Sequence, residues 1–377
     1  MARYKFDQIA HYLNEKRMPS EADRETYIGL EHLDSGSLTV TRWGSDVDIK
    51  GQKLVMHKGD ILFGRRNTYL KRAAIAPHDG LFSAHGMIWR PKEDVVDAGF
   101  FPFFVSSDYF MDEAIRISVG SLSPTINWRD LKELEFDLPD IDTQRKLSTL
   151  LWAMERAKTA YKNLIARTDE LVKSQFVEMI QPLLDTGNTI PLGELVETDR
   201  PITYGILKPG TGFPGGVPVV KVKDMKDGLI DQSDLLLTSP EIDNSYKRSR
   251  LRAGDLLISI RGSVGRMAEV PENLENANIT QDTARLTIKK EYNKVYVRGV
   301  LESQPLQHDM EKNIRGVAVK GINIGYLREL GIPMCSRSKQ DELAALYIQS
   351  DKSKFAAQQA LADLTATQKA LMRQYLG

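Results

Sequence analysis

The sequence predicts an α+β protein in which two similar mixed α/β domains are separated by two long antiparallel coiled-coil helices, with a pseudo-two-fold repeat. Three observations predict this architecture. Residues 142–180 carry apolar side chains at heptad spacing, and so do residues 338–376. The segments that precede these two runs share short sequences at a nearly constant shift. Two helices of equal length, one in the middle and one at the end of the chain, most simply pack on each other as an antiparallel pair.

The first segment, residues 5–140, alternates β-rich runs with glycines and prolines. Branched and aromatic residues concentrate in LTVTRW at 38–43, AAIA at 73–76 and GMIWRP at 86–91. Such runs bounded by turn residues predict short strands.

The central helix follows at residues 142–180. Its apolar positions alternate steps of three and four, which places them on one stripe of a helix. The stripe consists of Leu147, Leu150, Met154, Ala157, Tyr161, Leu164, Thr168 and Leu171. At ~1.5 Å per residue this helix is on the order of 55 Å long, so we expect it to need a partner. Asp142 is a good N-cap, and Pro182 with the turn-rich residues after it ends the helix.

The partner is expected at the end of the chain. After a second mixed segment at 190–334, a helix begins near Ser338, which is also a good N-cap. Its stripe consists of Ser350, Lys354, Ala357, Leu361, Leu364, Gln368, Leu371 and Tyr375.

The two halves of the chain are related by a repeat. GDILF at 59–63 recurs as GDLLI at 254–258, and NWRDLKEL at 127–134 recurs as NIGYLREL at 323–330. The same shift of about 196 carries Gln144 onto Gln340, while an earlier pair, 27–36 and 219–228, differs by about 192. A period this long indicates a duplication and excludes a solenoid. We therefore divide the chain into a first domain at 1–140, a central helix at 141–182, a second domain at 183–336 and a C-terminal helix at 337–377.

Composition restricts the class of protein. The 377 residues are 41% hydrophobic and 27% charged, with a formal net charge of zero. The single Cys335 excludes a disulfide framework and a cysteine-based zinc site, and it fits a reducing compartment. No apolar run is long enough for a membrane span or a signal peptide, so we expect a cytoplasmic protein without a membrane partner.

Positive charge is nevertheless concentrated in two segments at equivalent places in the repeat. Residues 57–72 carry five Lys and Arg against Asp60, and residues 246–266 carry six against Asp255. Recurrence at matched positions favours a nucleic-acid surface over a solvated face, and two such surfaces at a fixed separation suit a split DNA sequence.

The candidate DNA contacts come from these segments and from one residue beyond them. In the first domain they are Lys58, Arg65, Arg66, Asn67, Thr68, Tyr69, Lys71 and Arg72. In the second domain they are Tyr246, Lys247, Arg248, Arg250, Arg261, Ser263, Arg266 and Gln281. Arg can bond guanine, Asn67 or Gln281 adenine, and Thr68 or Ser263 either, while the remaining cations neutralise phosphates. Tyr69 and Tyr246 can stack, bond to phosphate or simply pack.

No catalytic motif stands out. GTGFPG at 210–215 matches G-x-G-x-x-G, but it leads into a strand-like run, so a loop is expected. The six histidines show no metal-ligand spacing, and no acidic cluster recurs across the repeat. Two other function classes remain open: a stand-alone nuclease or other DNA-processing enzyme with two active sites, and a scaffold that binds only protein through its long helices.

The sequence resembles the specificity (S) subunits of type I restriction-modification enzymes. In the first half the resemblance rests on GDILFGRRNTYLKRAAIA and GLFSAHGMIWRP. In the second half it rests on RPITYGILKPG, GVPVVKVKDM, GDLLISIRGSVG and NITQDTARL.

The resemblance implies that each domain is a target recognition domain that reads one half of a bipartite site in double-stranded DNA. It further implies that the helices fix the spacer and that the chain docks two methyltransferase (M) subunits and restriction (R) subunits. The chain itself would be non-catalytic and bind no cofactor. S-adenosylmethionine, ATP and Mg²⁺ would be held by the partner subunits of a DNA adenine methyltransferase and endonuclease.

Overall fold

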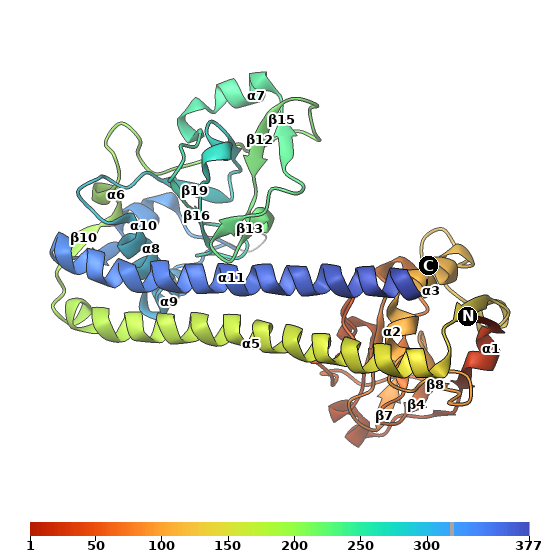
Figure 1. Cartoon of the computed structure of the whole chain (residues 1–377). Coiled ribbons are helices and arrows are strands. Elements are labelled where there is room, and N and C mark those ends of the chain that lie inside the picture. The colour runs from red at the N-terminus through yellow and green to blue at the C-terminus, as the bar shows by residue number, and fades with distance from the viewer. Residues whose placement is uncertain (317–319, 377) are drawn as a thin grey trace. The chain divides into compact units, whose positions relative to one another are not determined.

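The structure is a computed structural model that describes residues 1–316 and 320–376 (Figure 1). The chain divides into two compact units. Unit 1 comprises Met1–Lys162 and the chain from Gln359 onward, and unit 2 comprises Asn163–Gln358. Gly377, the last residue of the predicted C-terminal helix, lies outside the described residues.

Two long helices, α5 (Ile141–Asp185) and α11 (Arg337–Leu376), each contribute residues to both units (Figure 1). In unit 1, the first part of α5 packs on the last part of α11. There the side-chain amide of Gln368 donates to Glu155 at 3.0 Å. The helix α5 continues three residues past Pro182, which the sequence had placed at its end, because a proline in the last turn removes only one hydrogen bond.

In unit 2, the last part of α5 packs on the first part of α11. Lys354 donates to Asp169 at 2.9 Å, and the ring centroids of Phe176 and Tyr347 lie 4.9 Å apart. From the first pair to the second, α5 advances by seven residues while α11 goes back by seven. The helices therefore run antiparallel with heptad spacing, which confirms the predicted pair.

The stripe predicted for α11 is right, and the stripe predicted for α5 is right at five of its eight positions. All eight stripe positions of α11 are buried or half-buried. On α5, the positions that are buried or half-buried as predicted are Leu147, Met154, Ala157, Tyr161 and Thr168. Three predicted positions are instead 47, 53 and 57% exposed, namely Leu150, Leu164 and Leu171. The second inward row lies one residue later, at Leu151, Lys158, Ile165 and Val172.

The error has a physical cause. Adjacent helix positions such as 150 and 151 are separated by ~100° and can both border one seam, so spacing alone does not decide between them. Leu151 is fully buried in the core of unit 1, together with Leu147. Contact with the globular part of the unit therefore sets the rotation of α5.

The N-caps of the long helices lie two residues earlier than predicted, at Asp140 and Ser336 in place of Asp142 and Ser338. Each cap side chain accepts a hydrogen bond from the backbone N–H three residues later, at 2.9 and 3.4 Å respectively. The two observed caps are again 196 positions apart, so the repeat extends to the helix starts.

Unit 1 contains a four-stranded antiparallel sheet in the order β2-β8-β5-β6, a three-stranded sheet β3-β4-β7 and the pair β1-β9. Its strands are β1 (Ala2–Lys5), β2 (Ala10–Leu13), β3 (Lys16–Arg17), β4 (Lys53–Met56), β5 (Ile61–Phe63), β6 (Ala73–Ile75), β7 (Gly80–Phe82), β8 (Met87–Pro91) and β9 (Glu135–Leu138). Its short helices are α1 (Phe6–Ile9), α2 (Phe101–Ser106), α3 (Asp108–Arg116) and α4 (Trp128–Leu131).

Two of the three predicted strands in this unit are confirmed, as β6 and β8. The strand predicted at 38–43 is wrong: in this run only Thr39 forms an isolated bridge, with Ile75. The β-rich composition of that run serves packing, because Leu38 and Val40 are buried.

Unit 2 contains a four-stranded antiparallel sheet β11-β19-β16-β17, a three-stranded sheet β15-β12-β18 and the pairs β13-β14 and β10-β20. Its strands are β10 (Thr189–Pro191), β11 (Thr203–Tyr204), β12 (Val217–Val220), β13 (Met225–Lys226), β14 (Leu229–Ile230), β15 (Leu236–Thr238), β16 (Leu256–Ser259), β17 (Met267–Glu269), β18 (Asn278–Ile279), β19 (Thr283–Leu286) and β20 (Gly331–Pro333). Its short helices are α6 (Leu192–Leu195), α7 (Pro240–Ser245), α8 (Lys294–Glu302), α9 (Gln304–Lys312) and α10 (Ile324–Glu329).

The four-stranded sheet of each unit is buried on both faces. In unit 1, Ile61 and Phe63 of β5 face a core that includes α2 and α3, while Leu62 between them faces a second cluster. In unit 2, Leu256 and Leu257 of β16 divide in the same way between two clusters. The alternation of side chains along a strand explains why these strands read as continuous apolar runs.

The repeated Gly-Asp dipeptide builds the same turn in both units. Gly59 and Gly254 have φ of 92° and 83°, which glycine adopts without strain. Asp60 and Asp255 are each 2% exposed and accept from the backbone N–H three residues earlier, at 2.8 Å in both cases. The two units therefore share the same hydrogen bond in the turns that precede β5 and β16.

Candidate nucleic-acid interface

Arg66 and Arg261 occupy the same structural position in the two units. Each follows an inner strand of the four-stranded sheet, β5 or β16, and forms an isolated antiparallel bridge, Arg66 with Thr125 and Arg261 with Gly321. Thr125 also forms an antiparallel bridge with Val119, which closes a hairpin. Gly321 forms the same kind of bridge with Arg315. Both arginines are exposed. The matched arginines of the sequence are therefore matched in space within their own units.

In unit 1, the loop 64–72 is fixed to the hairpin 119–125, which we call the unit 1 hairpin. The N–H of Asn67 donates to the Pro124 carbonyl at 2.8 Å, and the Arg66 guanidinium donates to the Ser123 hydroxyl at 3.4 Å. Asn67 itself is left-handed, with φ of 54°, a conformation that asparagine tolerates better than most residues. The loop thus has a defined shape that presents Arg66 to solvent.

In unit 2, the loop 260–266 is fixed in a similar way. The N–H of Gly262 donates to the Lys320 carbonyl at 3.2 Å, and that of Ile322 donates to Ile260 at 2.9 Å. Residues 317–319 lie outside the described residues.

Arg72 and Arg266, also matched in the repeat, bind backbone carbonyls. Arg72 donates to Leu30 at 2.8 Å, and Arg266 donates to Val222 and Met225 at 3.3 and 3.1 Å. Leu30 and Val222 begin equivalent 3₁₀ turns. Burial lowers the pKa of Arg72. These two predicted DNA contacts thus have a structural role in holding the turns.

Three more predicted contacts are engaged within the protein. Lys71 lies 2.8 Å from Asp108 and 2.7 Å from Asp112; burial alone lowers its pKa, but these two hydrogen bonds raise it overall. Arg250 pairs with Asp243, which is 2% exposed. Thr68 is 1% exposed, and its hydroxyl donates to a backbone carbonyl at 3.3 Å.

The remaining predicted contacts are exposed or half-buried. The exposed group is Lys58, Arg66, Tyr69, Lys247, Arg248, Arg261 and Ser263, and the half-buried group is Arg65, Asn67, Tyr246 and Gln281. With its amide nitrogen turned toward the carbonyls of Ile206 and Leu207, at 2.7 and 3.2 Å, Gln281 donates to both. The ion pair of Arg261 with Asp282 is long, at 3.9 Å, and exposed, so it holds Arg261 only weakly.

The sequence prediction missed Leu122, at the tip of the unit 1 hairpin. Its side chain is 95% exposed, and that of Val119 is 65% exposed. The turn-rich run GSLSP at 120–124 signals a hairpin, but nothing in the sequence indicates that the hairpin adjoins Arg66.

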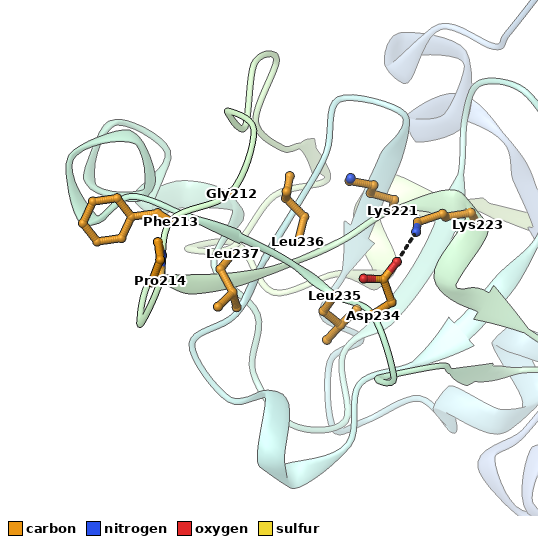
Figure 2. A pocket seen from close by; sticks show the side chains of 9 residues that line it. All are labelled: Gly212, Phe213, Pro214, Lys221, Lys223, Asp234, Leu235, Leu236 and Leu237. Atoms are coloured by element: carbon orange, nitrogen blue, oxygen red, sulfur yellow. Dashed lines mark hydrogen bonds and ion pairs between the residues drawn. The ribbon is translucent and has the colours of Figure 1, made fainter. Parts of the chain in front are cut away.

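The G-x-G-x-x-G match at 210–215 lies in a loop that leads into β12, so the expected loop is confirmed. The loop borders a shallow pocket of about 460 Å³ within unit 2 (Figure 2). Its lining is largely apolar, with Lys221 and an exposed ion pair between Lys223 and Asp234 at 3.1 Å. This open, leucine-lined surface has none of the features of a dinucleotide site.

Residues 1–316 and 320–376 contain neither a metal-binding cluster nor a membrane-spanning helix. In this part of the chain, no group of three or more His, Cys, Asp or Glu side chains is arranged to hold a metal ion. Across the same residues, no helix combines the length and apolarity that crossing a bilayer requires.

No protein-family model matches the sequence. Two curated relatives from Escherichia coli do: the type I restriction enzyme EcoBI specificity subunit, 32% identical over 201 residues, and the EcoDI specificity subunit, 22% identical over 176 residues. The matches cover 51% and 45% of this chain but only 42% and 39% of the relatives, so the matched part spans less than half of each relative.

Two solved structures share the fold over nearly the whole chain. The S subunit of a type I restriction-modification system from M. genitalium has a TM-score of 0.57 at 13% identity, covering 100% of this chain and 96% of that one. A chain from a structure on complex assembly and conformational transition of the type I R-M system has a TM-score of 0.50 at 18% identity, covering 99% and 97%. At these identities the structures establish the fold alone, which is two mixed domains with a pair of long antiparallel helices. The chain is therefore similar in sequence to specificity subunits of type I restriction enzymes over about half of its length, and it shares the fold of such subunits over nearly all of it.

Proposed function

We propose that this chain is the non-catalytic subunit that selects the DNA sequence for a type I restriction-modification complex. Each domain reads one half of a bipartite site in double-stranded DNA. The observation that carries the proposal is the equivalence of Arg66 and Arg261, which are exposed and bridged to a hairpin at the same position of two related folds. Duplicated loops of this kind suit two copies of one task, namely contact with two half-sites.

The exposed residues divide by chemistry into two roles. Arg66 and Arg261 present bidentate donors that suit a guanine edge, while the exposed Ser263 beside Arg261 can bond bases of other identity. Lys58, Lys247 and Arg248 are exposed cations that suit phosphates, which position the domain without reading sequence. Because Lys71, Arg72, Arg250 and Arg266 are already bonded within the protein, their contribution is to hold the loops in shape.

The long helices would fix the spacer between half-sites and dock the partner subunits. Both α5 and α11 contribute residues to the two units, so their length limits which spacings can be bound. The exposed leucines of α5, at positions 150, 164 and 171, fall at multiples of seven residues on one row outside the inner seam. A row of this type suits a further helix, and we propose that it receives a methyltransferase subunit.

Two methyltransferase subunits and the restriction subunits complete the proposed complex, which acts in the cytoplasm. The partners would hold S-adenosylmethionine, ATP and Mg²⁺ and carry out adenine methylation and cleavage. The part of this chain is to hold the duplex in register while a partner takes the adenine out of the stack.

The decisive test is a methylation map. The chain is co-expressed with its methyltransferase partner, and modified adenines are located across a genome. A motif split into two specified parts by a fixed gap supports the proposal. A continuous motif, or none, rejects it in favour of the scaffold, and metal-dependent cleavage by the isolated chain favours a nuclease.

Single substitutions assign the half-sites. Arg66→Ala should change the bases required in one half-site and leave the other intact, and Arg261→Ala should do the reverse, at roughly 1–3 kcal/mol per lost bidentate contact. Arg129→Ala, on α4, is the matched control, because Arg129 is 86% exposed at its side chain and lies outside the loops. If a substitution weakened DNA binding equally on all sequences, Arg66 or Arg261 would instead contact a backbone phosphate.

The spacer role has its own test. Inserting one heptad within 147–172 of α5, together with a matching heptad in α11, lengthens the pair by about 10 Å. This corresponds to about three base pairs at ~3.4 Å each, so the gap in the motif should grow by that amount. An unchanged gap would mean that the helices do not set the spacer between the half-sites.

A further inference from the structure

Leu122 is the most exposed of the large apolar side chains in the described residues, at 95%. It lies at the tip of the unit 1 hairpin, between Ser121 and Ser123. A single exposed leucine needs no explanation by itself, because apolar atoms make up much of any protein surface. Its surroundings, however, distinguish Leu122 from a leucine left on the surface by chance.

The hairpin that carries Leu122 is held rigidly. Val119 and Thr125 exchange two backbone hydrogen bonds of 3.0 Å, and Ile126 donates to Arg65 at 3.0 Å. The Pro124 carbonyl accepts from the N–H of Asn67 at 2.8 Å. The C-terminal arm of the hairpin is therefore anchored to the loop 64–72, and the two hydrogen bonds between Val119 and Thr125 hold the other arm to it, so ordering the tip on a ligand costs little conformational entropy.

A positive charge lies beside the tip. The guanidinium of Arg66 donates to the hydroxyl of Ser123, the neighbour of Leu122, so a cation and the apolar tip lie side by side. Residues 117–125 contain no acidic side chain. An apolar tip next to an arginine suits a partner that is negatively charged around an apolar interior, which is the character of a DNA groove with its stacked bases.

We propose that Leu122 is a sequence-reading residue of the first recognition domain, and that it makes an apolar contact with a base beside the contact made by Arg66. The inference rests on the proposed DNA-recognition function and adds a residue to it. Two base features have the required chemistry: the methyl group of thymine, and the face of a base exposed when a step is partly unstacked.

The test uses the complex of this chain with its methyltransferase partner and duplexes that carry the mapped motif. Leu122→Ser removes the apolar tip, and Leu122→Met keeps it. Leu229→Ser is the control, because Leu229 is an exposed leucine of unit 2, at 54%. Leu122→Ser should weaken binding about tenfold and relax the base requirement at one or two positions of the first half-site. Leu122→Met and Leu229→Ser should leave that half-site unchanged.

Two further measurements separate the two base features. If the contact is a thymine methyl, deoxyuridine at the affected position weakens the wild-type complex to the level of Leu122→Ser. If the contact is an unstacked step, 2-aminopurine beside it brightens on binding of the wild-type complex and stays quenched with Leu122→Ser.

The inference is overturned if Leu122→Ser matches the wild type in affinity and base preference, or weakens all sequences equally. In either case methylation of a bipartite motif by the same complex leaves the proposed function standing. Absence of any sequence-specific binding by the wild-type complex overturns both.

Discussion

Gln144 and Gln340, 196 positions apart, make the same pair of hydrogen bonds in the two units. The side-chain oxygen of Gln144 accepts from the N–H of Asp97 at 2.9 Å, and its amide donates to the Pro139 carbonyl at 2.8 Å. Gln340 accepts from Asn293 at 2.9 Å and donates to the carbonyl five residues before it, also at 2.9 Å. Both glutamines are buried, at 1 and 2% exposed, and each joins the start of a long helix to the globular part of its unit.

This relationship predicts a matched loss of stability. Gln144→Leu and Gln340→Leu each leave a backbone N–H and a carbonyl, partly or fully buried, without their partner, which costs about 2–4 kcal/mol of unfolding free energy. Urea unfolding of the purified chain measures the loss. Gln359→Leu is the control, because Gln359 is exposed on α11 and bonds only to Asp363 in the same helix, so its change should stay within about 0.5 kcal/mol.

Neighbouring leucines of α5 should differ sharply in their contribution to stability. Leu151 is fully buried, so Leu151→Ala should cost about 2–5 kcal/mol through lost burial and a residual cavity. Leu150→Ala should cost less than about 0.5 kcal/mol, because Leu150 is 47% exposed. Denaturant unfolding of the two variants compares them directly. Equal losses would contradict the observed rotation of the helix.

Leu164 and Leu171 extend this comparison to partner binding. Leu164→Ser combined with Leu171→Ser should leave the melting temperature of the chain nearly unchanged, because both side chains are exposed. The same variant should retain less methyltransferase subunit on copurification if the outer row of α5 is the docking surface. A lower melting temperature with normal copurification would argue against that assignment. Leu229→Ser, at an exposed leucine of unit 2 that is not part of α5 or α11, serves as the control.

The ion pair between α5 and α11 in unit 2 predicts a pH dependence. Burial alone raises the pKa of Asp169, but hydrogen bonds from Lys173 and Lys354 lower it overall. A carboxyl whose pKa is lowered by folding stabilises the protein above its unfolded pKa, which is 3.8, and this contribution is lost as pH falls through the folded value. The wild type should therefore be more stable than Asp169→Asn at pH 5–7, and the difference should shrink below about pH 4. Denaturant unfolding across this range measures it, and a difference that stays constant down to pH 2 would contradict the assignment.

Arg72 and Arg66 should separate stability from DNA recognition. Arg72→Ala leaves the Leu30 carbonyl without its donor and should cost about 1–3 kcal/mol of unfolding free energy. Arg66→Ala removes an exposed side chain and should change stability by less than about 0.5 kcal/mol, while it alters the required bases of one half-site. Thermal unfolding and the methylation map together test this contrast. If the Arg72→Ala protein were stable and its required half-site bases were altered, Arg72 would instead be a residue that contacts DNA.

The sequence by itself determined the duplication, the two long helices and their antiparallel pairing. These features depend on local patterns: heptad spacing reflects the helical period, and the Gly-Asp dipeptide reflects a turn that needs a left-handed glycine. The same patterns led to Arg66 and Arg261 as equivalent positions, because a constant shift in sequence becomes a constant position in a repeated fold.

Only the tertiary structure decided which cations of the two basic segments are already bonded within the protein. Lys71 is engaged by Asp108 and Asp112, and Arg72 by Leu30, so their partners come from segments about 40 residues away. Charge counts along the sequence cannot reveal these bonds, since an ion pair depends on distance in space. The choice of Leu151 over Leu150, and the placement of Leu122 beside Arg66, were likewise decided by packing between distant segments.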